Sequence, residues 1–246
     1  MRYLISGQTG FIGQAITKYL LSKEETVIPI PRNKSILSLV KLFTDYPPDY
    51  IIHLGAYGNH YYQKDFKKTV TANLLGTYNL LEAAKIFDYI KFYNISSSSV
   101  ALEKQTYYSM TKFCGEQLVG LYENTVNIRP HSVYGPGEAK HRFIPTVIDS
   151  LKTGSSMIVD TEATHDWVYI DDFIESLFEG KTEIGTGVKS TNKEIINMLE
   201  KISGKKLTYT FGKMRSYDHN NWVSKRGVPH IDCFEGLKKT YEYFTQ

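Results

Sequence analysis

The stretch "RYLISGQTGFIGQAITKYLLS", residues 2–22, decides the fold. A short apolar run leads into three glycines, and an amphipathic helical pattern follows directly. In parallel α/β sheets a turn of this kind holds the pyrophosphate of a dinucleotide. Gly7 allows the tight turn, Gly10 lets the backbone approach the phosphates, and Gly13 allows close packing of helix and sheet. The start of the helix adds unpaired N–H groups and a partial positive charge, so the stretch predicts dinucleotide binding.

The same alternation of strand and helix continues outward from this turn through the first two thirds of the chain. Further strands are predicted at 26–31, 50–54, 90–96 and 125–129, and helices at 36–46, 65–87 and 106–122. The strands are almost wholly apolar, which is typical of a parallel sheet covered on both faces. Right-handed crossovers make such a sheet doubly wound. The short interval between Arg32 and Tyr50 leaves no room for a further strand and helix, so we expect a sheet abbreviated on one side.

The pattern changes after Tyr134, where shorter helices and strands alternate up to the end of the chain. These elements are too small for an independent core, and we expect a lobe that packs at the carboxyl edge of the sheet and binds substrate. The predicted dinucleotide-binding domain comprises 1–134 plus 166–178, and the predicted substrate-binding lobe comprises 135–165 plus 179–246.

Composition excludes several classes of function. A formal charge of +3 without a long basic run argues against nucleic acid as a partner. No apolar run reaches the ~18–20 residues of a membrane span, so no membrane is expected. Cys114 and Cys233 lie far apart and the histidines are scattered, which predicts no metal site. Few thiols and no signal-peptide pattern indicate a cytoplasmic protein.

A Tyr-x-x-x-Lys spacing can place a phenol beside an ammonium group on one helix face. It occurs at Tyr19/Lys23, Tyr108/Lys112 and Tyr209/Lys213, and with 19 tyrosines in the chain such pairs arise by chance. Only Tyr108 begins a helix directly after a strand of the predicted sheet. A nearby ammonium lowers the pKa of a phenol, which is about 10 in water. Tyr108 could then take a proton from a hydroxyl or give one to a carbonyl.

Several longer motifs carry a resemblance to a known family. They are "TGFIG", "PDYIIHLGA", "TANLLGTYNLLEAAK", "NIRPHSVYGPG" and "HDWVYIDDF", and together they span most of the chain. The sequence resembles the extended short-chain dehydrogenase/reductase superfamily, in its NAD-dependent epimerase/dehydratase branch that acts on nucleotide sugars. The resemblance implies an α/β fold, a doubly wound parallel Rossmann sheet with a small C-terminal substrate-binding α/β lobe. It also implies a nucleotide-sugar substrate and a possible homodimer through the helices that contain Leu74–Leu81 and Tyr108–Leu121.

The resemblance also implies site residues. The family's catalytic hydroxyl stands three places before a valine, which from Val100 gives Ser97, with Ser98 as the alternative; Ser97, Tyr108 and Lys112 are then the expected catalytic group. The expected cofactor-binding residues are Gly7, Thr9, Gly10, Phe11, Ile12, Gly13, Arg32, Leu54, Gly55, Ala56, Asn73, Tyr108, Lys112, Pro130, His131 and Val133. The expected substrate contacts are Tyr57, Ser98, Ser132, Phe143 and His165.

Two of these substrate contacts have alternative roles. His165 stands where relatives have an arginine that grips the substrate diphosphate, and it could instead be a neutral histidine packed at the end of a strand. Tyr57 and its aromatic neighbours could line a sugar site or pack over the cofactor.

Departures from the family pattern bear on the reaction. Ser98 and Ser99 stand where the sugar 4,6-dehydratases carry an Asp-Glu pair, so we expect no dehydration. No acid follows the second strand until Asp45, and Arg32 stands near the expected ribose. This favours NADP(H), with NAD(H) as the alternative.

Four functions follow from these observations. The first is a 4-keto-sugar reductase that uses NADPH. The second is a nucleotide-sugar 4-epimerase that works through a transient 4-keto intermediate with bound NAD. A reductase of non-sugar ketones and a non-catalytic dinucleotide-binding sensor or scaffold are further alternatives, and the intact Tyr108 and Lys112 argue against the last.

Overall fold

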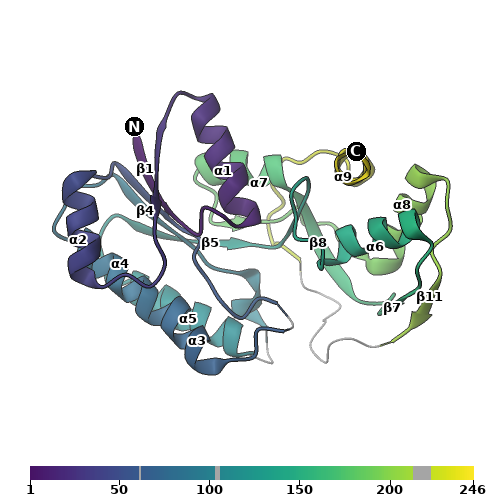
Figure 1. The fold of residues 1–246 in the computed structure, drawn as a ribbon, viewed down its shortest axis with the longest axis horizontal. Helices are drawn as coiled ribbons and strands as arrows, with labels where there is room; N and C mark the ends of the chain where they lie inside the picture. Colours follow the sequence, from purple (N-terminus) through teal and green to yellow (C-terminus); the bar gives the residue numbers. More distant parts are fainter. Residues whose placement is uncertain (61, 103–105, 213–222) are drawn as a thin grey trace. The chain divides into compact units, whose positions relative to one another are not determined.

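A computed structural model describes residues 1–60, 62–102, 106–212 and 223–246. The chain forms two compact units, Met1–Pro130 and His131–Gln246, coloured purple to teal and green to yellow in Figure 1. This division differs from the expected one, which ran to residue 134 and returned 166–178 to the first domain. Strands β6 (Ser132–Tyr134) and β8 (Thr164–Tyr169) pair with each other, and this pairing keeps both segments in the second unit.

Five parallel strands form the sheet of the first unit, in the order β2-β1-β3-β4-β5. They are β1 (Arg2–Ser6), β2 (Thr26–Ile30), β3 (Tyr50–His53), β4 (Lys91–Ile95) and β5 (Thr125–Pro130). Ser6 lies opposite Ile30 on one side and His53 on the other, so the carboxyl ends of these strands meet at one edge. The structure confirms the predicted α/β class and the parallel sheet, with β2 as its outer strand in the described part of the chain.

Helices cover both faces of this sheet (Figure 1). Helix α1 (Phe11–Ser22) lies on one face, and α2 (Ile36–Asp45), α4 (Gly76–Ala84) and α5 (Tyr107–Val119) lie on the other. The core between the sheet and α2 and α4 contains Leu4, Leu39, Phe43, Ile51, Leu81 and Phe92, all buried. Burial on both faces explains why the strands read as continuous apolar runs in the sequence.

The helix predicted at 65–87 is interrupted. Helix α3 (Phe66–Val70) passes into a π turn, η1 (Thr71–Leu75), before α4 begins. In this turn the N–H of Gly76 bonds to the carbonyl of Thr71, five residues earlier. Such turns are rare and frequently lie at functional sites, and this one contains the buried Asn73.

The second unit contains two small sheets. Strand β8 pairs parallel with β6 and antiparallel with β10 (Lys189–Thr191), while β11 (Tyr209–Phe211) pairs parallel with β7 (Met157–Val159). The remaining elements are α6 (Phe143–Thr153), α7 (Ile170–Phe178), β9 (Glu183–Ile184), α8 (Asn192–Ser203) and α9 (Cys233–Thr245). None of the helices in the described part of the chain has the length and apolar character needed to cross a membrane.

Candidate active site

The glycine turn follows β1 and is shaped by two close approaches. Gly7 has a φ of 74°, and a Cβ there would lie 2.8 Å from the backbone nitrogen of Gly55, so only glycine fits. A Cβ on Gly13 would lie 2.3 Å from the carbonyl oxygen of Gly7. Gly13 therefore packs against the turn itself, whereas packing of helix on sheet was expected. A Cβ on Gly10 would meet only that same oxygen, at 3.3 Å, so the space beside Gly10 is open.

The first turn of α1 is suited to an anion. Its N-cap is Gly10, which supplies no side-chain cap, and the first turn contains no acidic residue. The N–H groups of Phe11, Ile12 and Gly13 therefore have no intrahelical acceptor, and the helix dipole adds positive charge at this end. The preceding Thr9 is held by its carbonyl, which accepts from Gln14 Nε2 at 2.8 Å. Open space beside Gly10 and free donors next to it fit the pyrophosphate of a dinucleotide.

The turn after β2 is exposed and basic. Arg32 and Lys34 both lie on it at the surface, and no acid occurs between Ile30 and Asp45. The carbonyl of Lys34 accepts from Asn79 Nδ2 at 3.2 Å, which ties the turn to α4. The local charge is thus positive where an acid would bind the 2′-hydroxyl of NAD.

The segment after β3 is bonded to the end of β1, just before the glycine turn, and to the π turn. Leu54 donates its N–H to the carbonyl of Ser6, and Gly55 donates to Ser6 Oγ at 3.1 Å. Tyr57 exchanges two hydrogen bonds with the side chain of Asn73, at 2.8 and 2.9 Å. The predicted residues Leu54, Gly55, Ala56, Tyr57 and Asn73 therefore belong to one hydrogen-bonded region of the first unit.

The serine segment after β4 forms a short 3-10 turn, η2 (Ser98–Ala101), with Ser97 as its N-cap. Ser97 Oγ accepts from the backbone N–H of Ser99 at 3.1 Å and lies 2.8 Å from Ser99 Oγ. Ser98 and Ser99 are buried, whereas Ser97 is half-buried. The local backbone therefore holds the hydroxyl of Ser97 in place without closing it off.

Helix α5 begins with two adjacent tyrosines that differ in exposure. Thr106 and Ser109 form a reciprocal capping box that starts the helix at Tyr107. The side chain of Tyr107 is exposed and its ring lies 4.6 Å from that of Phe66, while Tyr108 is half-buried. Only Tyr108 of the two combines partial burial with a lysine four residues later.

Lys112 is the buried cation of this site. Its ammonium donates to the carbonyl of Ile95 at 2.7 Å, which fastens α5 to the end of β4 just before the serine segment. Burial lowers the pKa of Lys112 to about 8, and the nearby carboxylate of Glu116 partly opposes this shift. Lys112 therefore remains mostly charged at neutral pH. Its ammonium lies beside Ile95, the residue directly before the serine segment.

An ion pair that sequence reasoning missed involves the next residue on the same face of α5 as Tyr108 and Lys112. Glu116 lies one turn beyond Lys112 with its side chain buried, and its carboxylate receives Nε and Nη2 of Arg129 at 2.9 and 2.5 Å. The spacing of Tyr108, Lys112 and Glu116, four residues each, was visible in the sequence. The partner of Glu116, Arg129 on β5, could not be seen in the spacing, because the pair forms only when α5 packs against β5.

In the second unit three predicted substrate contacts gather around Trp167. Ser132 Oγ lies 3.4 Å from Nδ1 of the buried His165, whose ring lies 5.1 Å from the indole. The ring of Phe143 stacks on the indole of Trp167, with the ring centroids 6.0 Å apart. The structure therefore groups these residues while showing His165 as a buried side chain at a strand.

The predicted cofactor contacts after β5 are placed as follows. Pro130 ends β5, and Val133 lies in β6 opposite Val168. The side chain of His131 is buried, with Nε2 3.3 Å from Glu183 Oε1 and Nδ1 4.0 Å from Asp166 Oδ2. His131 is thus held between two carboxylates of its own unit.

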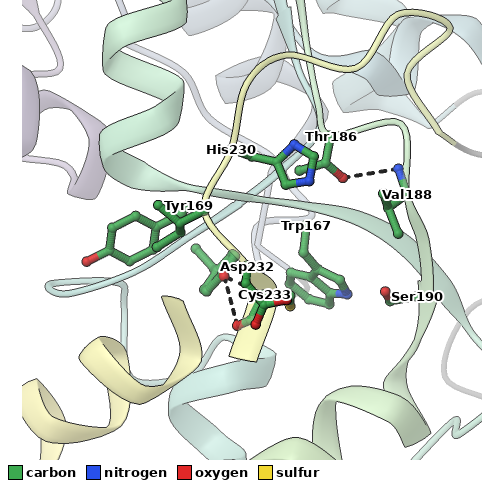
Figure 2. Close-up of a pocket in the computed structure, with 10 residues that line it drawn as sticks. Trp167, Tyr169, Thr186, Val188, Ser190, His230, Asp232 and Cys233 are labelled. Carbon is green, nitrogen blue, oxygen red and sulfur yellow. Dashed lines mark hydrogen bonds between the residues drawn. The ribbon is translucent and has the colours of Figure 1, made fainter. Parts of the chain in front are cut away.

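A cavity of about 170 Å³ lies in the second unit, and Figure 2 shows the side chains around it. It is lined by Tyr134, Trp167, Tyr169, Thr186, Val188, Ser190, His230, Ile231, Asp232 and Cys233. Burial raises the pKa of Cys233 to about 11, so its thiol stays protonated at neutral pH. No residue predicted from the sequence lines this cavity. Within the described ranges no three His, Cys, Asp or Glu side chains form a group that could hold a metal.

Comparison with known protein families decides the assignment. The model of the NAD dependent epimerase/dehydratase family matches residues 3–179. The chain belongs to this family. The predicted resemblance is confirmed, and a dinucleotide cofactor is confirmed with it, whereas the preference for NADP(H) over NAD(H) stays a prediction.

Members of the epimerase/dehydratase family with several activities are similar to this chain over its whole length. The UDP-glucose 4-epimerase of Mycolicibacterium smegmatis is 23% identical over 99% of this chain and 98% of its own. The dTDP-glucose 4,6-dehydratase of Haemophilus influenzae is 24% identical over 99% and 98%. The structure of UDP-glucuronic acid 4-epimerase from Bacillus cereus, in complex with UDP-glucuronic acid and NAD, matches with a TM-score of 0.85 and 27% identity, covering 100% of this chain and 99% of that one. Because a dehydratase is among these relatives, the expected absence of dehydration also stays a prediction.

Proposed function

We propose that this protein oxidises or reduces the C4 hydroxyl or carbonyl of a nucleotide sugar, with Tyr108, Lys112 and Ser97 as its catalytic residues. The observation that carries the proposal is the hydrogen bond from the buried Lys112 ammonium to the carbonyl of Ile95. It fixes a cation on α5, one turn after Tyr108 and beside the segment that presents Ser97. A phenol, a cation and a hydroxyl at the carboxyl edge of a parallel sheet are suited to carbonyl chemistry.

Each of the three side chains has a distinct role in this proposal. Tyr108 gives a proton to the carbonyl oxygen during reduction, or takes it from the hydroxyl during oxidation. The positive charge of Lys112 favours the phenolate form of Tyr108 by lowering its pKa. Ser97 donates a hydrogen bond to the same substrate oxygen and stabilises the charge that develops there. A bound nicotinamide supplies or accepts the hydride.

The cofactor is proposed to be NADP(H). The residues of the glycine turn and of the first turn of α1 would hold its pyrophosphate, and the segment 54–57 would lie along the same edge. Arg32 supports the choice because a guanidinium binds a 2′-phosphate well and no acid replaces it before Asp45.

A 4-keto-sugar reductase is the form of this activity that the cofactor site favours. A reductase exchanges its cofactor after each turnover, and an exposed basic turn after β2 suits an exchangeable NADPH. Ser98 and Ser99 supply no carboxyl group for the expulsion of water, which supports a reaction without dehydration.

A 4-epimerase with a retained NAD is the second candidate. It is supported by the Bacillus cereus 4-epimerase, which was solved with NAD bound and is similar over this whole chain. An epimerase would return the hydride to the same sugar and consume no cofactor.

A homodimer through α3–α4 and α5 is proposed as well. Large apolar side chains are exposed on these helices, namely Phe66, Leu75, Tyr78, Met110 and Phe113. Several large exposed apolar side chains on neighbouring helices support association through them, and a second copy of the chain offers the same side chains.

The test has two parts. The nucleotide retained on purification is extracted and identified, and CDP-, UDP-, GDP- and dTDP-linked 4-keto sugars are assayed for NADPH oxidation beside epimerisation of the matching hexoses. Tyr108→Phe should abolish turnover and leave cofactor affinity within a few-fold, while Tyr107→Phe, which alters the exposed neighbour, should keep wild-type activity. Full activity of Tyr108→Phe would refute the catalytic assignment. Cofactor-neutral epimerisation without NADPH oxidation would replace the reductase by the epimerase.

A further inference from the structure

We propose that His53 is a positioning residue, at the centre of a directed hydrogen-bond chain that joins the glycine turn to the helix carrying Tyr108. The part of the proposal that concerns catalysis rests on the proposed role of Tyr108. The hydrogen-bond chain itself rests only on contacts inside the first unit.

His53 lies at the end of β3 and is almost wholly buried. Its Nδ1 lies 2.6 Å from Ser6 Oγ, and its Nε2 lies 2.9 Å from Thr77 Oγ1. Burial, reinforced by the charge of Lys112, lowers the pKa of His53 to about 3. The ring is therefore neutral and carries one N–H, so one ring nitrogen donates and the other accepts.

The partners of the ring decide which nitrogen carries the proton. The hydroxyl of Thr77 donates to the carbonyl of Asn73 at 2.7 Å, so towards His53 it can only accept. Nε2 is therefore the protonated nitrogen, and Nδ1 accepts from the hydroxyl of Ser6. Ser6 Oγ in turn accepts from the backbone N–H of Gly55 at 3.1 Å. Every donor from Gly55 to Asn73 points the same way.

The chain continues through the side chain of Asn73 in the π turn. Asn73 Nδ2 donates to Thr111 Oγ1 at 2.9 Å as well as to the carbonyl of Tyr57. The hydroxyl of Thr111 then donates to the backbone carbonyls of Tyr107 and Tyr108, at 2.8 and 3.0 Å. All the side chains that take part in this hydrogen-bond chain are buried, namely Ser6, His53, Thr77, Asn73 and Thr111.

The hydrogen-bond chain ends at the two parts of the site whose distance matters for catalysis. These are the glycine turn, which would hold the cofactor, and Tyr108, the proposed acid and base. Gly55 at one end abuts Gly7, because a Cβ on Gly7 would lie 2.8 Å from the nitrogen of Gly55. At the other end lies the backbone of Tyr108. A change of about 1 Å in such a distance is enough to lower a rate by about two orders of magnitude. His53 therefore acts on the reaction through the geometry of its neighbours and touches no substrate.

Thr77→Val tests this inference, because valine keeps the shape of threonine and removes only the hydroxyl. This hydroxyl links the ring of His53 to the carbonyl of Asn73 in the π turn. The matched control is Thr240→Val in α9, which is equally buried and makes the same bond to a carbonyl four residues earlier, at 2.7 Å, but belongs to no chain. We expect Thr77→Val to lower kcat about tenfold or more with KM within a few-fold, and Thr77→Ser to restore it. Thr240→Val should keep the wild-type kcat.

A second measurement is independent of activity. In ¹⁵N-labelled protein the ring of His53, assigned by comparison with His53→Gln, should show the neutral Nε2–H form from pH 5 to pH 9. Thr77→Val should shift it towards the Nδ1–H form. If Thr77→Val does not fold, Ser6→Ala, which removes the donor to Nδ1, takes its place in the kinetic measurement, and its kcat should fall in the same way. In the ring measurement Ser6→Ala should keep the Nε2–H form, because Thr77 still accepts from Nε2.

The outcomes separate the inference from the proposed function. A wild-type His53 that is protonated or carries its proton on Nδ1 overturns the chain. So does a Thr77→Val enzyme with wild-type kcat, or an equal loss of kcat in Thr240→Val. The Nε2–H form together with an active Tyr108→Phe enzyme would leave the chain standing and refute the role of Tyr108.

Discussion

Replacing Lys112 by methionine should remove activity without lowering stability at neutral pH. Methionine fills a similar volume in the buried site but carries no charge and no donor. The perturbation therefore separates what the cation contributes to the fold from what it contributes to the reaction.

The magnitude follows from the burial of the ammonium. Burial lowers the pKa of Lys112 from 10.5 to about 8, which corresponds to about 3 kcal/mol by which folding disfavours the charged form. Its hydrogen bond to the carbonyl of Ile95 contributes about 1 kcal/mol in the opposite direction. At pH 7 we therefore expect Lys112→Met to be about 2 kcal/mol more stable than the wild type.

The sign of this difference should reverse at high pH. Between pH 8 and 10.5 the unfolded chain binds the proton that folded Lys112 has lost, so the wild type gains stability as the pH rises through this interval. Above it the lysine is neutral in both states, and the hydrogen bond should make the wild type the more stable form by about 1 kcal/mol.

Urea unfolding of both proteins at pH 7 and pH 10.5, beside steady-state kinetics at pH 7, measures these quantities. Lys18→Met on the exposed face of α1 is the control and should change neither stability nor activity by much. The reasoning is refuted if Lys112→Met is destabilised by more than about 2 kcal/mol at pH 7. Retention of wild-type kcat by this variant would remove Lys112 from the mechanism.

Three further predictions concern other parts of the chain. Arg32→Ala should weaken NADPH binding about tenfold or more with little effect on NADH, while Lys41→Ala should change neither; equal losses for both nucleotides, measured by fluorescence titration, would refute the NADP(H) assignment. Burial raises the pKa of Glu138 from 4.5 to about 8, so between these values the folded protein keeps a proton that the unfolded chain has lost. The wild type should therefore lose about 3 kcal/mol of stability relative to Glu138→Gln as the pH rises from 4.5 to 7. A pH-independent difference between the two proteins in urea unfolding would contradict this. Leu75→Glu on the exposed apolar surface should convert a dimer to a monomer in sedimentation velocity, and an unchanged sedimentation coefficient would exclude this interface.

The sheet and its helices could be predicted because their signals are local. Strands buried on both faces read as apolar runs, and the glycine turn fixes the first crossover by three residues alone. The π turn at Thr71–Leu75 could not be predicted, since the apolar period of residues 65–87 continues through it. The reason for Gly13 was also missed, because its clash is with the carbonyl of Gly7, a contact that exists only once the turn has closed.

The site shows a similar division. Tyr108 and Lys112 were selected by their place after a strand, and the structure adds the hydrogen bond from Lys112 to Ile95, which no spacing reveals. The ion pair of Glu116 with Arg129 and the chain through His53 join segments far apart in the sequence. A polar residue in an apolar strand is the signal that could have found His53, because a buried histidine requires partners for both ring nitrogens.

The four serines after β4 show how neighbours can define a functional hydroxyl. Ser97 Oγ already accepts from the N–H of Ser99, and the two hydroxyls lie 2.8 Å apart. The proposed role of Ser97 requires its proton for the substrate oxygen, so in the hydrogen bond between the two hydroxyls Ser99 must be the donor. A glutamate at position 99, which the family resemblance implies for the dehydratases, would when ionised only accept and would draw the proton of Ser97 towards itself. The serine at this position is therefore consistent with a reaction that needs Ser97 as a donor and expels no water.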